Sequence, residues 1–185
     1  MVAREMPARN YGRVAKLLHW LMFALVAAQF VVAFLMPDIG RGTVPGTLIN
    51  LHLSIGFTII VVIVLRWLWR MGHPVPLDTD DGPRWQHAVA RVTHALLYVL
   101  LLANPFLGWA NASARDWNID VFGLFRLPHL VAARSQLGRL SGDVHIYLAW
   151  TLLGLIALHV AAALYHYFVR HDRVLQRMLP GSQTE

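Results

Sequence analysis

Four apolar stretches, each long enough to cross a bilayer, constrain the fold of this chain more than any other feature. Crossing about 30 Å of hydrocarbon takes roughly 20 helical residues. The stretches cover residues 15–36, 48–69, 88–109 and 143–167. The composition agrees, because 57% of the 185 residues are hydrophobic and only 14% are charged. We therefore predict an all-α integral membrane protein whose residues 1–185 form a single four-helix transmembrane domain.

The connections between these stretches differ in character. Residues 37–47 and 70–87 contain the Pro and Gly residues that are typical of turns and loops. The third connection, residues 110–142, contains VFGLFRLPHLVAARSQLGRL and is apolar enough to lie on the membrane surface. The first apolar stretch follows basic residues, as in a signal peptide, but it is too long and has no small-residue cleavage site. We expect it to be retained as the first span.

Lysine and arginine residues near the span ends predict the orientation, because cytoplasmic loops carry an excess of them. Eleven lie on the side of the termini and the second connection, and five on the other side. These are Arg4, Arg9, Arg13, Lys16, Arg66, Arg70, Arg84, Arg91, Arg170, Arg173 and Arg177 against Arg41, Arg115, Arg126, Arg134 and Arg139. Both termini are therefore predicted to be cytoplasmic. The net charge of +6 is mainly this signal, and without a basic soluble domain nucleic-acid binding is not expected.

Two histidines of the fourth stretch, His145 and His159, are fourteen positions apart. On a helix this separation is roughly 21 Å and returns to within about 40° of the same face. His52 matches His145 in depth near the outer side, and His19 matches His159 near the cytoplasmic side. An imidazole inside a bilayer is expensive without a partner, so these histidines are candidates for function.

Each matched pair can ligate one iron from the opposite faces of a haem, which predicts two bis-histidine b-type haems stacked across the bilayer. The chain has no cysteine, so the haems are held without the C-x-x-C-H attachment. Iron with six ligands and no open position favours electron transfer over oxygen binding. His94 competes with His19 for the inner iron.

Other interpretations of the histidines stay open. They can simply form hydrogen bonds between helices, as in a membrane interaction protein without redox chemistry. Zinc or copper would require three or four converging ligands, and the stretches contain almost no carboxylates. His166 lies about 10 Å beyond His159 on almost the same face, too far to share its iron but well placed to form a hydrogen bond with a bound molecule.

The whole chain resembles the prokaryotic cytochrome b561 family, which is related to the haem-carrying membrane subunits of hydrogenases and formate dehydrogenases. The resemblance lies in LLHW, LINLHLSIG, ARVTHALLYVLLLANPFLG and DVHIYLAWTLLGLIALHVAAALYHYF. It implies that His19 and His159 hold the cytoplasmic haem, and that His52 and His145 hold the periplasmic one. His94 matches a family histidine that is not assigned as a ligand.

Small four-helix members of this family look like superoxide oxidases of the bacterial inner membrane. These oxidise superoxide at the periplasmic face and reduce ubiquinone. The ending ALYHYF resembles that group and implies that His166 contacts the quinone. The basic quinone partner that the family carries in the second connection has no clear counterpart here, and Arg84 is the nearest candidate.

Superoxide as the donor would require an anion to be gathered at the outer face. The third connection and the start of the fourth stretch carry four arginines and three aspartates, so their net charge is +1. The arginines are Arg115, Arg126, Arg134 and Arg139. Such a surface can accelerate the arrival of a small anion, although membrane lipid headgroups are an alternative partner. The alternative function is an electron-transfer subunit that docks a periplasmic dehydrogenase or hydrogenase and delivers electrons to quinone. The same haems would serve both functions.

Overall fold

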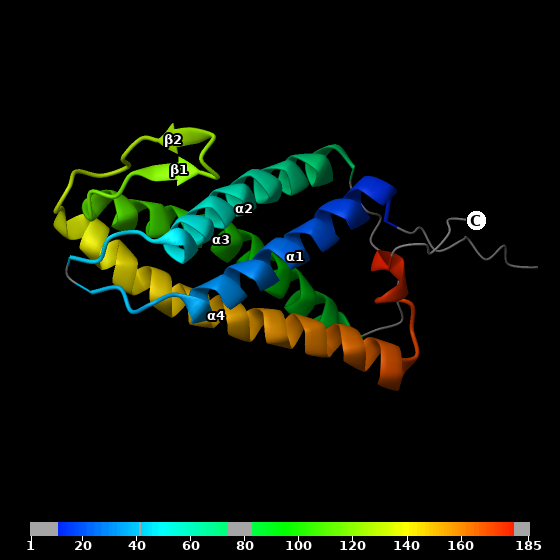
Figure 1. The fold of residues 1–185 in the computed structure, drawn as a ribbon. Helices are drawn as coiled ribbons and strands as arrows, with labels where there is room; N and C mark the ends of the chain where they lie inside the picture. The colour runs from blue at the N-terminus through cyan, green and yellow to red at the C-terminus, as the bar shows by residue number, and fades with distance from the viewer. Residues whose placement is uncertain (1–10, 41, 74–82, 180–185) are drawn as a thin grey trace, which may run out of the picture.

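The computed structural model describes residues 11–40, 42–73 and 83–179. The four long helices are α1 (Arg13–Leu35), α2 (Thr47–Gly72), α3 (Arg84–Ala114) and α4 (Gln136–Tyr165) (Figure 1). A short hairpin between α3 and α4 consists of β1 (Ile119–Val121) and β2 (Phe125–Leu127). After α4 come the π-helical turn η1 (His166–Arg170) and the 3₁₀ turn η2 (Gln176–Met178). All four long helices are long and apolar enough to cross a membrane, which confirms the predicted fold.

The ends of the helices follow local sequence signals. Pro37 follows the end of α1, and Pro83 immediately precedes α3. Proline and the residue before it both disfavour a continuing helix. Ser135 caps α4 by accepting a hydrogen bond from the Gly138 N–H at 3.3 Å. This cap explains why α4 begins at Gln136, several residues before the predicted apolar stretch. The apolar stretch indicates where the chain crosses lipid, and the cap determines where the helix begins.

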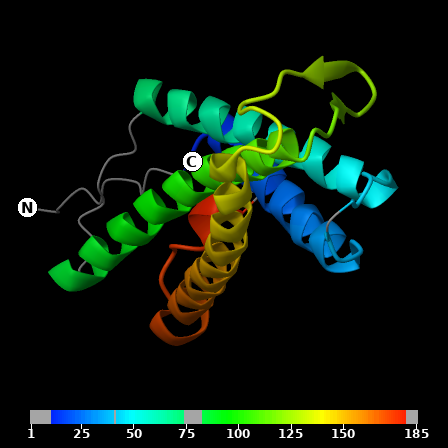
Figure 2. The same cartoon turned by 90° about the vertical axis from the view of Figure 1, so that its left-hand side faces the viewer.

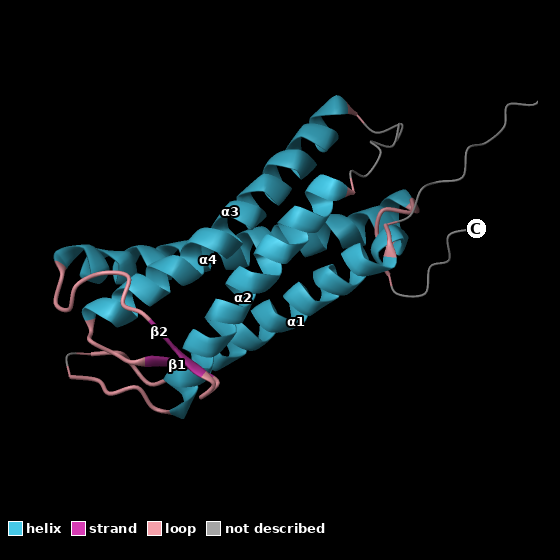
Figure 3. Ribbon diagram, turned by 90° about the horizontal axis from the view of Figure 1, so that it is seen from above, coloured by secondary structure: helices cyan, strands magenta, loops and turns pink. Residues whose placement is uncertain are grey.

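The helices pack as two pairs, α1 with α2 and α3 with α4, and contacts between α2 and α3 join them (Figure 3). The α1–α2 seam contains Met22, Val26, Ile55, Ile59 and Ile63. We call the end of the bundle that carries the β-hairpin the hairpin end (Figure 1). The opposite end, where α1 begins and α4 stops, is the terminal end.

Both described ends of the chain lie at the terminal end, where the Trp20 indole N–H donates to the Met178 carbonyl at 2.8 Å. This contact holds η2 against α1. An even number of crossings places both ends on one side, as the orientation prediction requires. That this side is cytoplasmic stays a prediction, and Arg4, Arg9 and Arg41, which contributed to it, lie outside the described residues.

The third connection forms a short β-hairpin, which the sequence analysis did not predict; whether it lies on the membrane surface stays a prediction. Its strands pair antiparallel, with Ile119 opposite Leu127. Ile119, Val121 and Leu127 are buried in a cluster with Ile49 of α2, whereas Phe125 is exposed. One face of the segment therefore packs on the bundle, and only the other face is available to lipid. Figure 2 shows the hairpin projecting beside the helices.

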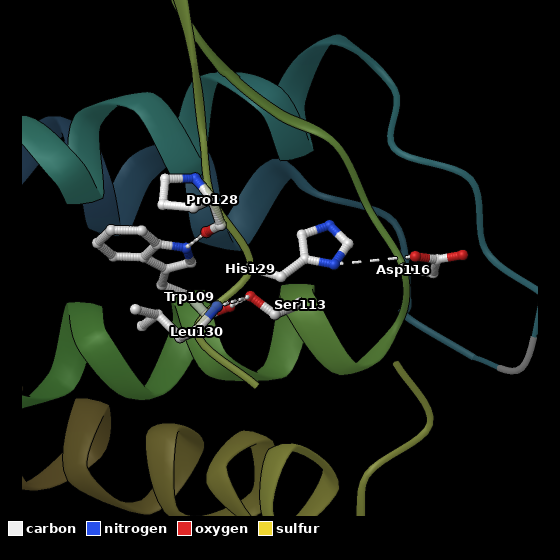
Figure 4. A network of polar contacts seen from close by, with 6 residues as sticks. All are labelled: Trp109, Ser113, Asp116, Pro128, His129 and Leu130. Carbon is white, nitrogen blue, oxygen red and sulfur yellow. Dashed lines mark hydrogen bonds and ion pairs between the residues drawn. The ribbon is translucent and has the colours of Figure 1, made fainter. Parts of the chain in front are cut away.

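Ser113 near the end of α3 anchors the segment that returns from the hairpin (Figure 4). Its hydroxyl donates to the Trp109 carbonyl at 2.9 Å and accepts the Leu130 N–H at 3.1 Å. The Trp109 indole donates to the Pro128 carbonyl at 3.0 Å. Ser113 is fully buried, and its removal would break both of these hydrogen bonds. These contacts hold the hairpin over one end of the bundle.

Candidate functional site

The structure brings His52 and His145 together at the hairpin end. His52 projects from α2 and His145 from α4, and their ring centroids are 6.1 Å apart with the planes at 83°. The His145 Nδ1 lies 2.9 Å from the Asn104 carbonyl oxygen of α3. A carbonyl oxygen only accepts, so Nδ1 carries the hydrogen and Nε2 is left as the nitrogen with a free lone pair. The backbone of α3 thus orients this imidazole.

Several features of this region suit a flat ligand between the two rings. The His52 imidazole is largely buried and lies against the backbone of Gln29 on α1. A Cβ at Gly108 would lie 3.2 Å from His145 Cε1, so the missing side chain allows the ring to lie against α3. A pocket that is partly open at the surface is lined by His52, Gly108, Trp109 and His145, among others.

Three histidines meet nearer the terminal end. The ring centroids of His19 on α1 and His159 on α4 are 6.4 Å apart. His94 on α3 lies closer to His159, with the centroids 5.3 Å apart. The structure therefore brings together the predicted pair and also its predicted competitor. The depth argument from the sequence placed all three at one level, and the structure agrees.

Arg66 of α2 is a residue of this region that the sequence analysis used only for orientation. It interacts electrostatically with all three histidines. Its Nε donates to the Tyr98 hydroxyl at 3.0 Å. Arg66, Tyr98 and Trp69 help line a second pocket, which is partly open at the surface. A signal was present in the sequence, because an arginine inside an apolar stretch is itself a functional candidate.

His166 follows the last residue of α4 and contacts Asp172, which lies six residues later. The His166 Nδ1 is 2.5 Å from Asp172 Oδ2. Asp172 is a second residue that the sequence analysis missed, since its position beyond the span gave no reason to place it near His166. Arg84 is the exposed first residue of α3. Within the described ranges no hydrogen bond or ion pair joins Arg84 to His166.

The four arginines proposed to attract an anion have different surroundings. The Arg126 Nε lies 3.0 Å from Asp120 Oδ1, and the hydrogen bond and charge of Asp120 raise the pKa of Arg126. The Arg115 Nη1 donates to the Gly40 carbonyl at 3.0 Å. The Arg139 Nη1 donates to the Arg134 carbonyl at 2.7 Å. Arg126 is therefore paired as a charge, and Arg115 and Arg139 are partly engaged in holding loops.

The fold and these histidines define a helical membrane protein with imidazoles clustered at two levels of one bundle. Over residues 10–181 the chain matches the family described as prokaryotic cytochrome b561. It is 31% identical to cytochrome b561 homolog 2 of Escherichia coli (strain K12), over 95% of this chain and 94% of that protein. The chain belongs to the prokaryotic cytochrome b561 family, whose members are membrane haem proteins of electron transfer that bind haem b.

Two further relatives are similar over most of their length. The probable superoxide oxidase CybB of Yersinia pestis is 30% identical over 88% of this chain and 92% of that protein. Cytochrome b562 of Cereibacter sphaeroides is 28% identical over 92% of this chain and 95% of that protein.

The residues present fit haem b. With metal–nitrogen bonds of roughly 2 Å, two imidazoles on opposite sides of one iron have ring centroids roughly 6 to 6.5 Å apart. The His52–His145 distance of 6.1 Å and the His19–His159 distance of 6.4 Å match this spacing. The His94–His159 distance of 5.3 Å is shorter.

Proposed function

We propose that this chain is a di-haem oxidoreductase of the bacterial inner membrane that transfers electrons from superoxide to ubiquinone. In this proposal His52 and His145 hold one haem b at the hairpin end, facing the periplasm. His19 and His159 hold the other near the terminal end, facing the cytoplasm. Each haem, when bound, accepts and releases one electron. The observation that carries the proposal is the pair of imidazole sets at two levels, each with the spacing that one iron requires.

The overall reaction balances without another reductant. Two superoxide anions, one quinone and two protons give two molecules of oxygen and one quinol. The relative named as a probable superoxide oxidase supports superoxide as the donor. The arginines of the third connection would attract the anion. Because Asp120 largely cancels the charge of Arg126, we assign most of that attraction to Arg115, Arg134 and Arg139.

The quinone is proposed to bind at the terminal end, where His166 lies beyond the inner histidines. An imidazole at this position can form a hydrogen bond with a quinone oxygen and supply a proton to it. Arg84 is the weaker of the two proposed quinone contacts, because in the described part of the chain nothing links it to His166. The exposed apolar faces of the helices, including Trp150 and Phe168, would contact membrane lipid.

The test is to mix the purified, oxidised protein with superoxide in a stopped-flow spectrometer and to follow the reduced b-type haem bands. Rapid reduction is expected, followed by reoxidation when a short-chain ubiquinone is present. Superoxide dismutase, added first, should abolish the reduction. Intact haems that superoxide leaves oxidised would overturn the proposal. That result would instead favour an electron-transfer subunit served by a periplasmic dehydrogenase or hydrogenase.

A further inference from the structure

The backbone reverses direction immediately after α4. Residues His166–Arg170 form a π-helical turn, a rare geometry that is frequent at functional sites. The next residue, His171, has a φ of 52°, which is uncommon for a residue other than glycine. This reversal turns the chain back, so that the Asp172 N–H donates to the His166 carbonyl at 3.2 Å. The backbone therefore brings Asp172 to His166.

The Asp172 carboxylate is held at both oxygens. Oδ2 lies 2.5 Å from the His166 Nδ1, and Oδ1 accepts the Val174 N–H at 3.1 Å. About a quarter of the His166 side chain and a fifth of the Asp172 side chain are exposed, so the pair is only partly covered by the protein. These two hydrogen bonds fix the orientation of the carboxylate.

Asp172 is ionised at neutral pH. Burial alone would raise its pKa, but the hydrogen bonds from His166 and Val174, together with the charges of His166 and Arg170, lower the pKa below its ordinary value. The contact is thus present above the ordinary aspartate pKa and is lost only as the pH falls through the lowered value. An ionised carboxylate only accepts hydrogen bonds, so the His166 Nδ1 carries a hydrogen and Nε2 is directed away from Asp172.

We propose that Asp172 is a positioning residue that holds His166 with Nε2 directed at the quinone, so that this nitrogen delivers protons during quinone reduction. The inference rests on the proposed function, because it takes quinone as the molecule that His166 contacts. Each proton leaves the His166 Nε2 for an oxygen of the reduced quinone, while the Nδ1–H stays bonded to Asp172. Water then returns a proton to Nε2. Two such transfers accompany the two electrons that convert a quinone to a quinol.

Two neighbours of the pair are identified among the described residues. Arg170 is the charged group that interacts with Asp172 from the π-helical turn, and the Tyr165 ring lies 6.0 Å from the His166 ring. The segment after Asp172 is held against α1 by the contact between Trp20 and Met178. The backbone is therefore held both before His166, by α4, and after Asp172, by the contact with α1. A residue that orients the side chain of another residue requires such support.

The test measures quinone reduction without superoxide. The holoprotein is reduced anaerobically, mixed with a short-chain ubiquinone at several concentrations, and followed by haem reoxidation between pH 6 and 9. We expect Asp172→Asn to lower the maximal rate by about 10-fold or more, with little change in the quinone concentration at half-maximal rate. The matched control is Asp116→Asn, which changes an exposed carboxylate near His129 at the hairpin end and should leave the rate unchanged.

A double-mutant comparison separates positioning from general damage. In a His166→Gln background, Asp172→Asn should lower the rate by less than about two-fold, because residues that act as one unit are not additive. A full additional loss would overturn the inference, and so would an Asp172→Asn rate equal to that of Asp116→Asn. Should Asp172→Asn lose haem, Asp172→Glu is tested next. With haem retained it should react at least about threefold more slowly than wild type, and a wild-type rate would overturn the inference.

The same experiment distinguishes this inference from the function on which it rests. A wild-type protein that quinone does not reoxidise would remove the proposed function. A wild-type protein that quinone reoxidises at the same rate as Asp172→Asn would leave that function standing and remove only the role of Asp172.

Discussion

The two ends of the bundle present their histidines in different ways. At the hairpin end the rings of His52 and His145 face each other, and the Asn104 carbonyl and Gly108 fix the position of His145. Nearer the terminal end the rings of His19, His94 and His159 meet, and a cation, Arg66, interacts with all three. Among the described residues the first site offers one pairing of rings, whereas the second offers His159 two neighbours.

This difference matches the two tasks in the proposed reaction. A site that takes electrons from a small anion requires a fixed geometry and little else. A site that passes electrons to a quinone must also supply protons, and at the terminal end His166 and Asp172 lie next to the chain reversal after α4. Polar and aromatic side chains also line the pocket near Arg66. The predictions below test this contrast.

The largest effect is expected from the hairpin-end pair. Replacing His145 or His52 by Ala removes one of two ligands, and no third histidine lies within ring contact of the pair in the described residues. We expect the haem-to-protein ratio, measured by pyridine haemochrome spectra, to fall by half. Superoxide-driven reduction of the remaining haem should be abolished. His129→Ala, a histidine substitution at the same end, is the control and should retain all haem. Retention of both haems in His145→Ala would refute this pairing.

The next prediction concerns the choice of partner for His159. Because the His19–His159 spacing suits one iron and the His94–His159 spacing is shorter, His19→Ala should lose one haem while His94→Ala keeps both. The measurement is the same haem ratio, combined with low-temperature spectra that resolve the two haems. Loss of the inner haem in His94→Ala, with retention in His19→Ala, would reverse the assignment and leave the hairpin-end pairing intact.

A smaller effect should follow from crowding His145. A Cβ at Gly108 would lie 3.2 Å from His145 Cε1 and 3.3 Å from Nδ1, so Gly108→Ala forces a small displacement of the ring. Overpacking of this kind costs about 1–3 kcal/mol, and we expect weaker retention of the hairpin-end haem alone in a thermal haem-release assay. The control is Gly154→Ala on α4, where an added Cβ would meet nothing within 4 Å. Equal haem release in the two variants would show that α3 does not fix the geometry of this site.

Much of the fold follows from the sequence because the bilayer imposes it. An apolar stretch of about 20 residues has few options other than a spanning helix, so the four helices were predicted. The start of α4 at Gln136 and the hairpin were not. The start of α4 depends on the Ser135 cap, and the hairpin depends on contacts with distant residues such as Ile49. Periodicity along one segment contains no information about such long-range contacts.

In the candidate site, too, some features follow from the sequence and others depend on the folded structure. Matching depths brought His52 to His145 and His19 to His159, because depth in a straight helix is a count of residues. Asp172 could not be predicted, because its contact with His166 requires the π-helical turn and the left-handed His171. The proximity of Arg66 to three histidines depends on how α2 is rotated about its own axis relative to the other helices. Counting residues along the sequence gives the depth of Arg66 but not this rotation.

The smallest effect is expected from the anion-attracting arginines, where charges at the hairpin end differ in how well they are paired. Arg126 is bonded to Asp120 through two nitrogens, at 3.0 and 3.3 Å. Removing Arg126 therefore exposes a carboxylate, and removing Asp120 exposes a guanidinium. Arg126→Gln should lower the rate constant for superoxide by about two-fold or less, and Asp120→Asn should raise it by a similar factor. Both changes should shrink as salt is raised from about 0.01 to 0.15 M, because exposed charges are screened. Stopped-flow rates at several salt concentrations measure this. A larger loss in Arg126→Gln that is independent of salt would instead make Arg126 a direct contact of the anion.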